Sequence, residues 1–355
     1  MADGYRQRRA TIHDVAREAG VSAATVSKVL RGVSSVKADN ARRVHDAVTS
    51  LDYRMDPLAS GLRNEQRRIL GAVVPDLESP FFGALVTGLE RVAEEAGYAM
   101  IVASSRESEA READLVARMN DWRVAGTVLV PVRSERGKGP ERLRDLGMEA
   151  VLVDRASADA RFDTVAADNH RASADVASFL VGAGHRHILL HGATRISKAV
   201  RTRIEGFTKC VEAIDLDVRV ETLLSDGEAE AQRRDVADYL EARPDGARPT
   251  AIFSLSQHST LLVLSELRRR SIAIPADIAL VGFDDADWMQ TTWPSITAVA
   301  QPVAAIAERA VASLLDRIEG EKMGFPVQHL EPCRMIVRES AGAERLPSRR
   351  TLSGG

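Results

Sequence analysis

The sequence lacks most features that mark secreted proteins, metalloproteins and membrane proteins. It has only two cysteines, Cys210 and Cys333, which lie far apart and outside any CxxC or Cys/His cluster. This pattern predicts two free thiols in a reducing compartment. No apolar run approaches the ~20 residues of a membrane span. We therefore expect no membrane partner.

The catalytic motifs of common enzyme classes are also missing. There is no HExxH, P-loop or GxGxxG motif and no triad spacing, and His170, His185 and His187 lack the spacing of metal ligands. We expect no enzyme activity, no cofactor and no metal. Residues 1–9 are rich in arginine with no apolar stretch behind them, which argues against a secretory signal. The expected location is the cytoplasm, in association with the nucleoid.

Charge is distributed unevenly along the 355 residues. Residues 1–68 carry 13 Lys and Arg against 8 Asp and Glu, whereas the remainder carries 35 against 43. A basic head on an acidic body is suited to a head that contacts a polyphosphate such as nucleic acid.

The first fifty residues show the apolar spacing of three short helices. Thr11 is the expected N-cap of the first helix, with Asp14 as its capping-box partner, and Gly20 ends that helix and permits a tight turn. Ser22 is the expected cap of the second helix. The predicted helices span residues 12–19, 23–31 and 39–50. Two helices joined by such a turn are typical of a helix-turn-helix, whose second helix lies in the major groove of DNA.

The second helix carries the expected DNA contacts. Hydroxyls at the groove edge can bond phosphates, and they belong to Ser22, Thr25 and Ser27. The side chains expected to face the bases are Ala23, Ala24 and Lys28. Alanine can contact only apolar groups such as a thymine methyl, whereas Lys28 can donate to guanine O6 or N7. Thr11 and Arg31 complete the contacts predicted in the head.

The string from Thr11 to Gly32 closely resembles the head of the lactose-repressor (LacI/GalR) family. The family signature T-I-x-D-V-A-x-x-A-G-V-S-x-x-T-V-S-x-V-L-x-G is matched at every fixed position, and the resemblance continues to about residue 340. It implies a transcription regulator that binds double-stranded palindromic operator DNA as a homodimer. No leucine heptad follows Ser340, so a tetramer is not expected.

Residues 53–68 resemble the family's hinge, which folds into a helix on operator DNA. By that resemblance Leu62 inserts into the minor groove at the operator centre and kinks it; the alternative is an ordinary linker leucine. Asp56 and Gly61 make this hinge more acidic and looser than usual. A further departure is Lys37, which stands where the family has a capping Ser or Thr before the third helix.

From Ile69 onward, short apolar strands alternate with amphipathic helices. The predicted strands are 69–74, 98–103, 126–130, 150–153, 187–190, 220–224, 250–254 and 278–282. The predicted helices include 81–96, 110–122, 171–181, 228–242 and 302–318. Such repeats predict parallel sheets covered on both faces, and their length predicts two lobes like those of periplasmic binding proteins.

These patterns give the expected domain organisation. It comprises a small all-α helix-turn-helix domain (1–52), a hinge (53–68), a two-lobed α/β effector-binding and dimerisation domain (69–340) and a flexible tail (341–355). We expect the first lobe at about 69–166 and 295–325, and the second at about 167–294 and 326–340. Ligands of open α/β sheets bind at the carboxyl ends of strands, so the cleft between the lobes is the expected site.

The resemblance implies that Arg203 and Asp284 reach into this cleft and grip an effector. Asp76 and Phe81, after the first strand, and Trp288 are secondary candidates for its polar and aromatic walls. Alternatives are a structural salt bridge for Arg203, a turn cap for Asp284, and core positions for the aromatic residues.

The family usually has Asn-Asp after the strand that ends at residue 254. Here Ser256 and Gln257 take those places, followed by His258. Ser256 is therefore a predicted but weaker effector contact. The departure indicates either an unusual effector or compensation by Gln257 or His258.

The predicted function is a repressor released from its operator by a small, sugar-like effector. The alternative is a co-regulator whose DNA binding is strengthened by a corepressor, such as a nucleobase or phosphometabolite, or by a partner protein. A secreted sugar-binding protein would share the lobes but lack the head.

Overall fold

A computed structural model describes residues 10–30, 36–51, 53, 68–159, 161–193, 197–214, 217–225, 229–243, 246–320 and 324–342. The chain divides into two compact units, residues 1–67 and 68–355, which we call the head and the sensor. Within the described ranges, no helix is long and apolar enough to cross a bilayer.

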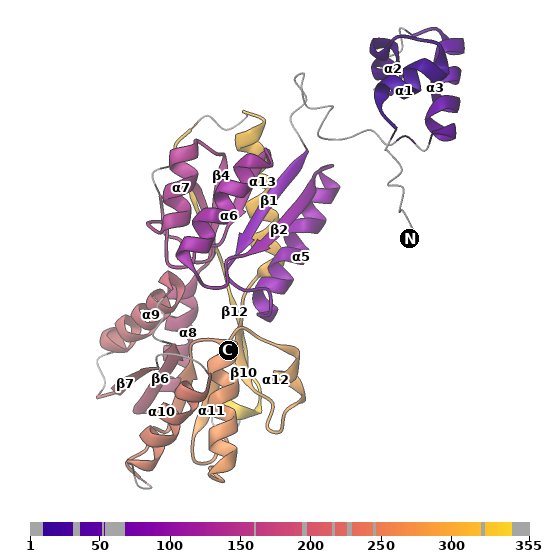
Figure 1. The fold of residues 1–355 in the computed structure, drawn as a ribbon. Coiled ribbons are helices and arrows are strands. Elements are labelled where there is room, and N and C mark those ends of the chain that lie inside the picture. The colour runs from indigo at the N-terminus through magenta and orange to yellow at the C-terminus, as the bar shows by residue number, and fades with distance from the viewer. Residues whose placement is uncertain are drawn as a thin grey trace, which may run out of the picture. The chain divides into compact units, whose positions relative to one another are not determined.

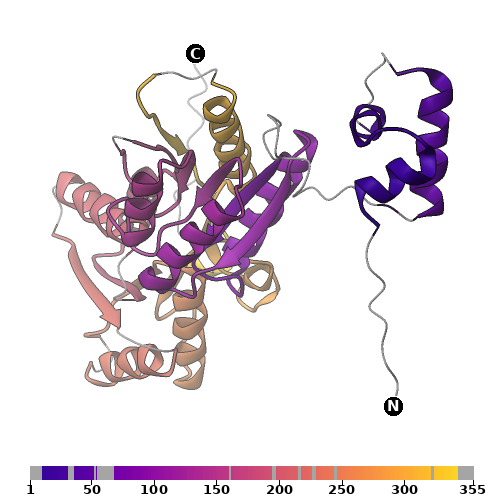
Figure 2. The same cartoon turned by 45° about the horizontal axis from the view of Figure 1, so that its top comes forward.

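The head contains the three expected helices (Figure 2), which are α1 (Ile12–Ala19), α2 (Ala23–Leu30) and α3 (Ala38–Ser50). The predicted capping box at α1 is confirmed: the Asp14 N–H donates to Thr11 Oγ1, and the Thr11 N–H donates to the Asp14 carboxylate. Gly20 ends α1 in the left-handed conformation, with φ of 62°. The helices enclose a small core of Val15, Ala16, Ala19, Val26, Val29, Val44 and Ala47.

The first lobe of the sensor is built on a six-stranded parallel sheet (Figure 1). Its strand order is β11-β5-β4-β3-β1-β2, and all neighbouring strands run parallel. The strands are β1 (Ile69–Val74), β2 (Ala99–Ser104), β3 (Gly126–Leu129), β4 (Ala150–Val153), β5 (Asp163–Ala167) and β11 (Gln328–Glu331).

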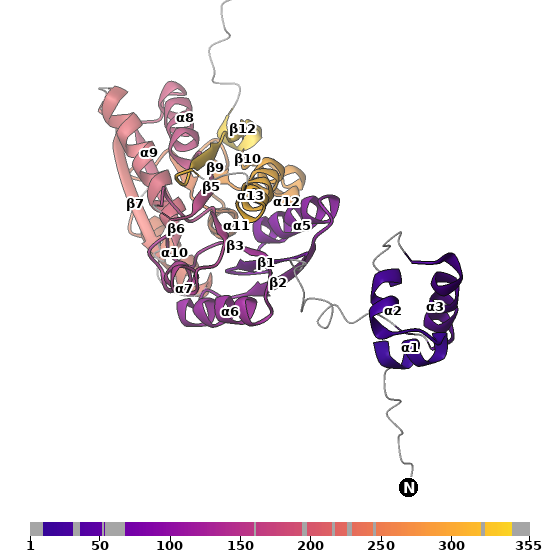
Figure 3. The ribbon, with the colours of Figure 1, turned by 90° about the horizontal axis from the view of Figure 1, so that it is seen from above.

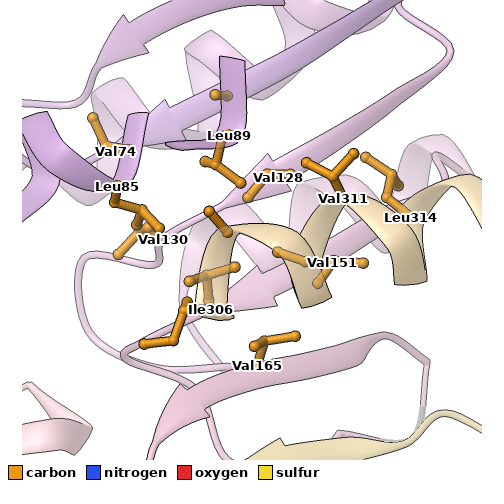
Figure 4. Packing of buried hydrophobic residues seen from close by; sticks show 14 of the residues in the cluster. Val74, Leu85, Leu89, Val128, Val130, Val151, Val165, Ile306, Val311 and Leu314 are labelled. Atoms are coloured by element: carbon orange, nitrogen blue, oxygen red, sulfur yellow. The ribbon is translucent and has the colours of Figure 1, made fainter. Parts of the chain in front are cut away.

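Helices cover both faces of this sheet, which explains its near-continuous apolar strands. One face packs against α5 (Pro80–Glu95) and α13 (Val303–Ile318), which lie side by side (Figure 3). Figure 4 shows side chains of these two helices meeting the strand valines of the sheet. The other face packs against α6 (Glu109–Asp121) and α7 (Lys138–Leu146).

The second lobe has a second six-stranded sheet, in the order β12-β10-β9-β8-β6-β7. Only β12 runs antiparallel to its neighbour. The strands are β6 (His187–Ala193), β7 (Arg219–Ser225), β8 (Ala251–Ser254), β9 (Ala279–Phe283), β10 (Thr297–Ala300) and β12 (Arg334–Ile336). A short 3₁₀ helix, η1 (Glu339–Ala341), follows β12.

Helices again cover both faces. One core lies under α8 (Asn169–Gly182) and α9 (Lys198–Ile214), and it contains Phe207, Phe253 and Phe283. The opposite core lies under α10 (Ala229–Glu241) and α11 (Gln257–Arg269), with α12 (Asp287–Thr291) at its edge.

The lobe boundaries differ from the expected ones. Residues 295–325 were assigned to the first lobe, but β10 lies in the second sheet; residues 326–340 were assigned to the second lobe, but β11 lies in the first sheet. The chain therefore crosses between the lobes three times, before α8, between β10 and α13, and between β11 and β12. The last strands are short and partly polar, so their pairing depends on long-range contacts rather than on a local apolar pattern.

Candidate DNA-binding helix and effector cavity

Helix α2 presents a polar face of small side chains together with one exposed lysine. Ala24 and Lys28 are exposed one helical turn apart, and Ala23, Thr25 and Ser27 are half-buried. Residues four apart share a helix face. The structure therefore places Lys28 beside the small methyl side chain of Ala24, which leaves room for the close approach of a base pair.

The beginning of α2 is fixed by the side chain of Ser22. The Thr25 N–H donates to Ser22 Oγ at 3.1 Å, and the hydroxyls of the two residues lie 2.9 Å apart. This confirms the predicted cap. No side-chain cap holds the start of α3 at Lys37, as expected from the substitution there. Two predicted DNA contacts, Arg31 and Leu62, lie outside the described residues.

The sensor contains a cavity of about 1350 Å³ between its lobes. Its walls follow directly after strands of both sheets: Asp76 comes after β1, Arg133 after β3 and Arg155 after β4 in the first lobe. In the second lobe, Ser225 ends β7 and Asp284 follows β9. The cavity thus lies at the carboxyl ends of two parallel sheets, where open α/β folds bind their ligands.

In the first lobe the wall is dominated by a fixed ion pair. The two Nη atoms of Arg155 each lie 2.8 Å from a carboxylate oxygen of Glu107, and Nη1 also donates to the Val132 carbonyl. The guanidinium lies over the ring of Phe82, 5.3 Å from its centroid. Burial opposes the charge of Arg155, but the bond to Glu107 raises its pKa. The pair offers rigid donors and acceptors to a polar ligand.

A buried carboxylate supports the same wall from behind. Glu112 is fully buried on α6, and it accepts hydrogen bonds from the backbone N–H groups of Val132 and Gly139. A Cβ at Gly139 would collide with the Glu112 side chain, so glycine is required there. Burial raises the pKa of Glu112 to about 7, against the effect of these two bonds. This contact fixes the segment that carries Arg133 into the cavity.

In the second lobe, residues at the start of α11 form one wall of the cavity. Ser256 caps this helix by accepting from the Ser259 N–H at 3.2 Å, and it borders the cavity. Gln257 and His258, the two candidates for compensating the missing family asparagine, border it as well.

Arg203 lies beneath this wall and is only 4% exposed. Its Nε donates to Asn169 Oδ1 at 2.7 Å, its Nη1 donates to the Leu255 carbonyl at 2.6 Å, and the guanidinium lies 3.5 Å from the centroid of the Phe283 ring. The ion pair with Asp284 is longer, at 3.9 Å. In this structure Arg203 organises the cavity floor, while Asp284 borders the cavity itself.

The other predicted effector contacts are only partly brought together. Asp76 borders the cavity, and its carboxylate accepts from the Glu78 N–H. Phe81 and Trp288 do not border it: Phe81 packs onto the first-lobe core, and Trp288 packs onto the core under α10 and α11. For Phe81 the reason is the helical phase at the start of α5, which turns Phe82 rather than Phe81 toward the cavity.

Several residues of the cavity were missed from the sequence, among them Glu107, Glu109, Arg133, Arg155, Ser225 and Gln232. Three of them, Arg133, Arg155 and Ser225, lie within three residues of the end of a predicted strand. The carboxyl-end rule for parallel sheets would have identified Arg133 and Arg155 if it had been applied strand by strand.

A smaller cavity, of about 210 Å³, lies where the chain first crosses between the lobes. It is bordered by Asp154, Asp168, His170 and Lys198. Asp154 is 6% exposed with φ of 64°, and burial raises its pKa although the charge of Arg203 opposes the shift.

Comparison with known proteins matches both units of the chain. Residues 11–56 match the family of bacterial regulatory proteins called the lacI family, and residues 177–341 match a periplasmic binding protein-like domain. A crystal structure of the lac repressor dimer, bound to operator and the anti-inducer ONPF, superposes with a TM-score of 0.83. It is 22% identical and covers 94% of this chain and 99% of its own, which supports the fold.

Two relatives extend the match over nearly the whole chain. The HTH-type transcriptional regulator PtxS of Pseudomonas aeruginosa is 31% identical over 339 residues, which cover 94% of this chain and 96% of PtxS. The HTH-type transcriptional repressor CytR of Escherichia coli is 27% identical over 335 residues, 94% of this chain and 97% of CytR. The chain therefore belongs to the LacI family, as a transcriptional regulator with a helix-turn-helix DNA-binding domain and a two-lobed effector-binding domain.

Proposed function

We propose that this regulator is a repressor which binds a palindromic operator as a homodimer and leaves it when a small, sugar-like effector enters the cavity. The observation that carries this proposal is the position of the cavity, whose walls come from both lobes. A ligand that contacts both walls binds best when they close, so its binding free energy is available to change the arrangement of the lobes. The name of the relative CytR supports the repressor role.

The chemistry of the walls supports a polar, hydroxyl-rich effector. Fixed pairs such as Arg155 with Glu107 combine donors and acceptors, and Phe82 provides an aromatic surface beside them. A corepressor bearing phosphate is the second candidate. Arg201 borders the cavity and forms no ion pair with another described residue, so its positive charge is available to a phosphate. The two candidates predict opposite effects on DNA binding.

The first test measures operator release. The full-length protein is used to select its operator from random duplexes, and affinity is then measured by fluorescence anisotropy with glucose, ribose, cellobiose, adenine or fructose bisphosphate. We expect one of the saccharides to weaken operator binding by roughly 5–150-fold, the usual range of allosteric coupling. Linkage requires the operator to weaken binding of that saccharide by the same factor.

The outcomes separate the candidates. Tighter operator binding with adenine or fructose bisphosphate would establish the corepressor instead. If none of the five compounds changes operator affinity, the proposed mechanism of release is wrong. A selection that yields no palindrome would contradict the homodimer.

The second test concerns Lys28. Lys28→Ala should weaken operator binding by about 1–3 kcal/mol and relax the preference at one base pair, because an exposed lysine among alanines is placed to donate to a guanine. Affinities for all single-base-pair variants of the operator give the measurement. Lys209→Ala removes an exposed lysine of the sensor and should change none of them. A uniform loss over all sequences would instead identify a phosphate contact.

A further inference from the structure

Three buried polar side chains lie near the carboxyl ends of neighbouring strands in the second lobe. His191 on β6 and Ser254 on β8 are fully buried, and Ser225 on β7 is 1% exposed. Within the described residues, both ring nitrogens of His191 and both serine hydroxyls lack a hydrogen-bond partner. Buried polar groups are normally paired, so such a group needs an explanation.

Strand alternation places the three side chains on one face of the sheet. Two residues before each of them are Leu189, Leu223 and Ile252, and all three belong to the core under α10 and α11. His191 and Ser254 are also direct register partners in the parallel ladder. The side chains therefore point to the side of the sheet that α10 and α11 cover, with Ser225 two residues further along because its register partner is Ala193.

The main cavity borders the second lobe at this end of the sheet, and its lining includes Ser225 but not His191 or Ser254. Ser225 itself lines the cavity, together with Gln232 from α10 and His258 from α11. His258 is exposed and is an electrostatic neighbour of His191. An exposed side chain such as that of His258 changes rotamer readily.

We propose that His191, Ser225 and Ser254 form a subsite at the edge of the cavity, opened by a rotamer change of His258, that binds an uncharged, hydroxyl-bearing end of the effector. The proposal rests on the sensing role proposed for the cavity and specifies what this part of it recognises. A hydroxyl group both donates and accepts. It therefore suits two serine hydroxyls and a neutral imidazole, which has one donor and one acceptor nitrogen.

The same environment disfavours a charged end. Burial lowers the pKa of His191 to about 4, so the ring carries no charge to pair with a carboxylate or phosphate at neutral pH. Asp235 is a second electrostatic neighbour of His191, and its negative charge repels an anion. Burying a charge without a partner is strongly unfavourable. A neutral saccharide therefore fits, whereas a sugar acid bound by its carboxylate does not.

The test uses His191→Phe and Ser254→Ala in the full-length protein. Glucose, ribose and cellobiose are the neutral probes and gluconate is the charged one, with affinities measured by calorimetry. For the neutral saccharide that binds the wild type, each variant should lose about tenfold or more in affinity, since the ligand hydroxyl loses its buried partner. Without ligand, the thermal midpoint should stay constant or rise, because an unpaired polar group has been removed.

Ser173→Ala is the matched control. Ser173 is also fully buried with no partner for its hydroxyl in the described part of the chain, but it lies on α8 and borders neither cavity. It should leave saccharide affinity unchanged. If His191→Phe fails to fold, Ser254→Ala still decides the question, because it removes one atom only.

The outcomes distinguish this proposal from the proposed function. Wild-type affinity in both variants overturns the subsite, and so does a panel in which no neutral saccharide binds, or one in which gluconate alone binds. Affinity that depends on His191 and Ser254, without any change in operator binding, supports the subsite and overturns release by the effector.

Discussion

Arg203→Ala is expected to lower the free energy of unfolding of the sensor by about 3–5 kcal/mol, the usual cost of removing one partner from a buried charged network. The substitution leaves the Asn169 amide oxygen and the Leu255 carbonyl without their donor. It also leaves the Asp284 carboxylate without its nearest positive charge. Because Asp284 borders the cavity, the response to effector should be lost as well.

Urea unfolding followed by circular dichroism measures the change. Arg201→Ala is the matched control, since Arg201 lies two residues away on α9 but is exposed, and its loss should alter stability by no more than about 0.5 kcal/mol. Arg203→Lys should fall between the two, because lysine keeps the charge but cannot reproduce the forked geometry. Equal stability of the two alanine variants would show that Arg203 does not organise the floor.

Glu112 should make the sensor less stable as the pH rises from about 4.5 to about 7. Its pKa in the folded protein is raised from 4.5 to about 7, mainly by burial. Between these values the folded state holds a proton that the unfolded state has released, so stability falls with increasing pH and levels off above about 7. The shift corresponds to about 3 kcal/mol in total.

Other carboxylates titrate in the same window, so the measurement compares two proteins. Glu112→Gln cannot titrate, and the difference in unfolding free energy between wild type and variant should therefore change by about 3 kcal/mol across this range. Glu90→Gln, at an exposed position on α5, is the control for making the same substitution elsewhere in the sensor. A difference for Glu112→Gln that does not change with pH would mean that the pKa of Glu112 is not raised.

Elements with a strong local pattern were predicted closely. The predicted strands 69–74 and 150–153 coincide with β1 and β4, and the predicted helix 302–318 begins one residue before α13. In these segments the apolar period or a capping residue marks the ends. The strands β5, β10, β11 and β12 were not predicted, since each begins with a polar residue, has no apolar run of more than three residues, and is stabilised by pairing with distant segments.

The position of the candidate site in the cleft was predictable from the sequence, but the identity of every side chain that borders it was not. Asp76, Ser256 and Asp284 border the cavity as expected, because each follows a strand end. The choice between Phe81 and Phe82 depends on the phase of α5 against the sheet. Arg203 donates its hydrogen bonds to Asn169 and to the Leu255 carbonyl, neither of which is close to it in sequence. Such long-range contacts leave no signal in a local pattern.

The three crossings between the lobes have a consequence for synthesis on the ribosome. Residues of β1 to β5 emerge before the second lobe, but the face of their sheet that α5 covers in part is completed by α13, which ends at Ile318. The apolar surface that will meet Ile306, Val311 and Leu314 thus stays open while the whole second lobe is being translated (Figure 4). A nascent chain in this state exposes the kind of surface that aggregates or recruits chaperones. A ribosome that stops near residue 300 therefore releases a product with an unfinished first lobe.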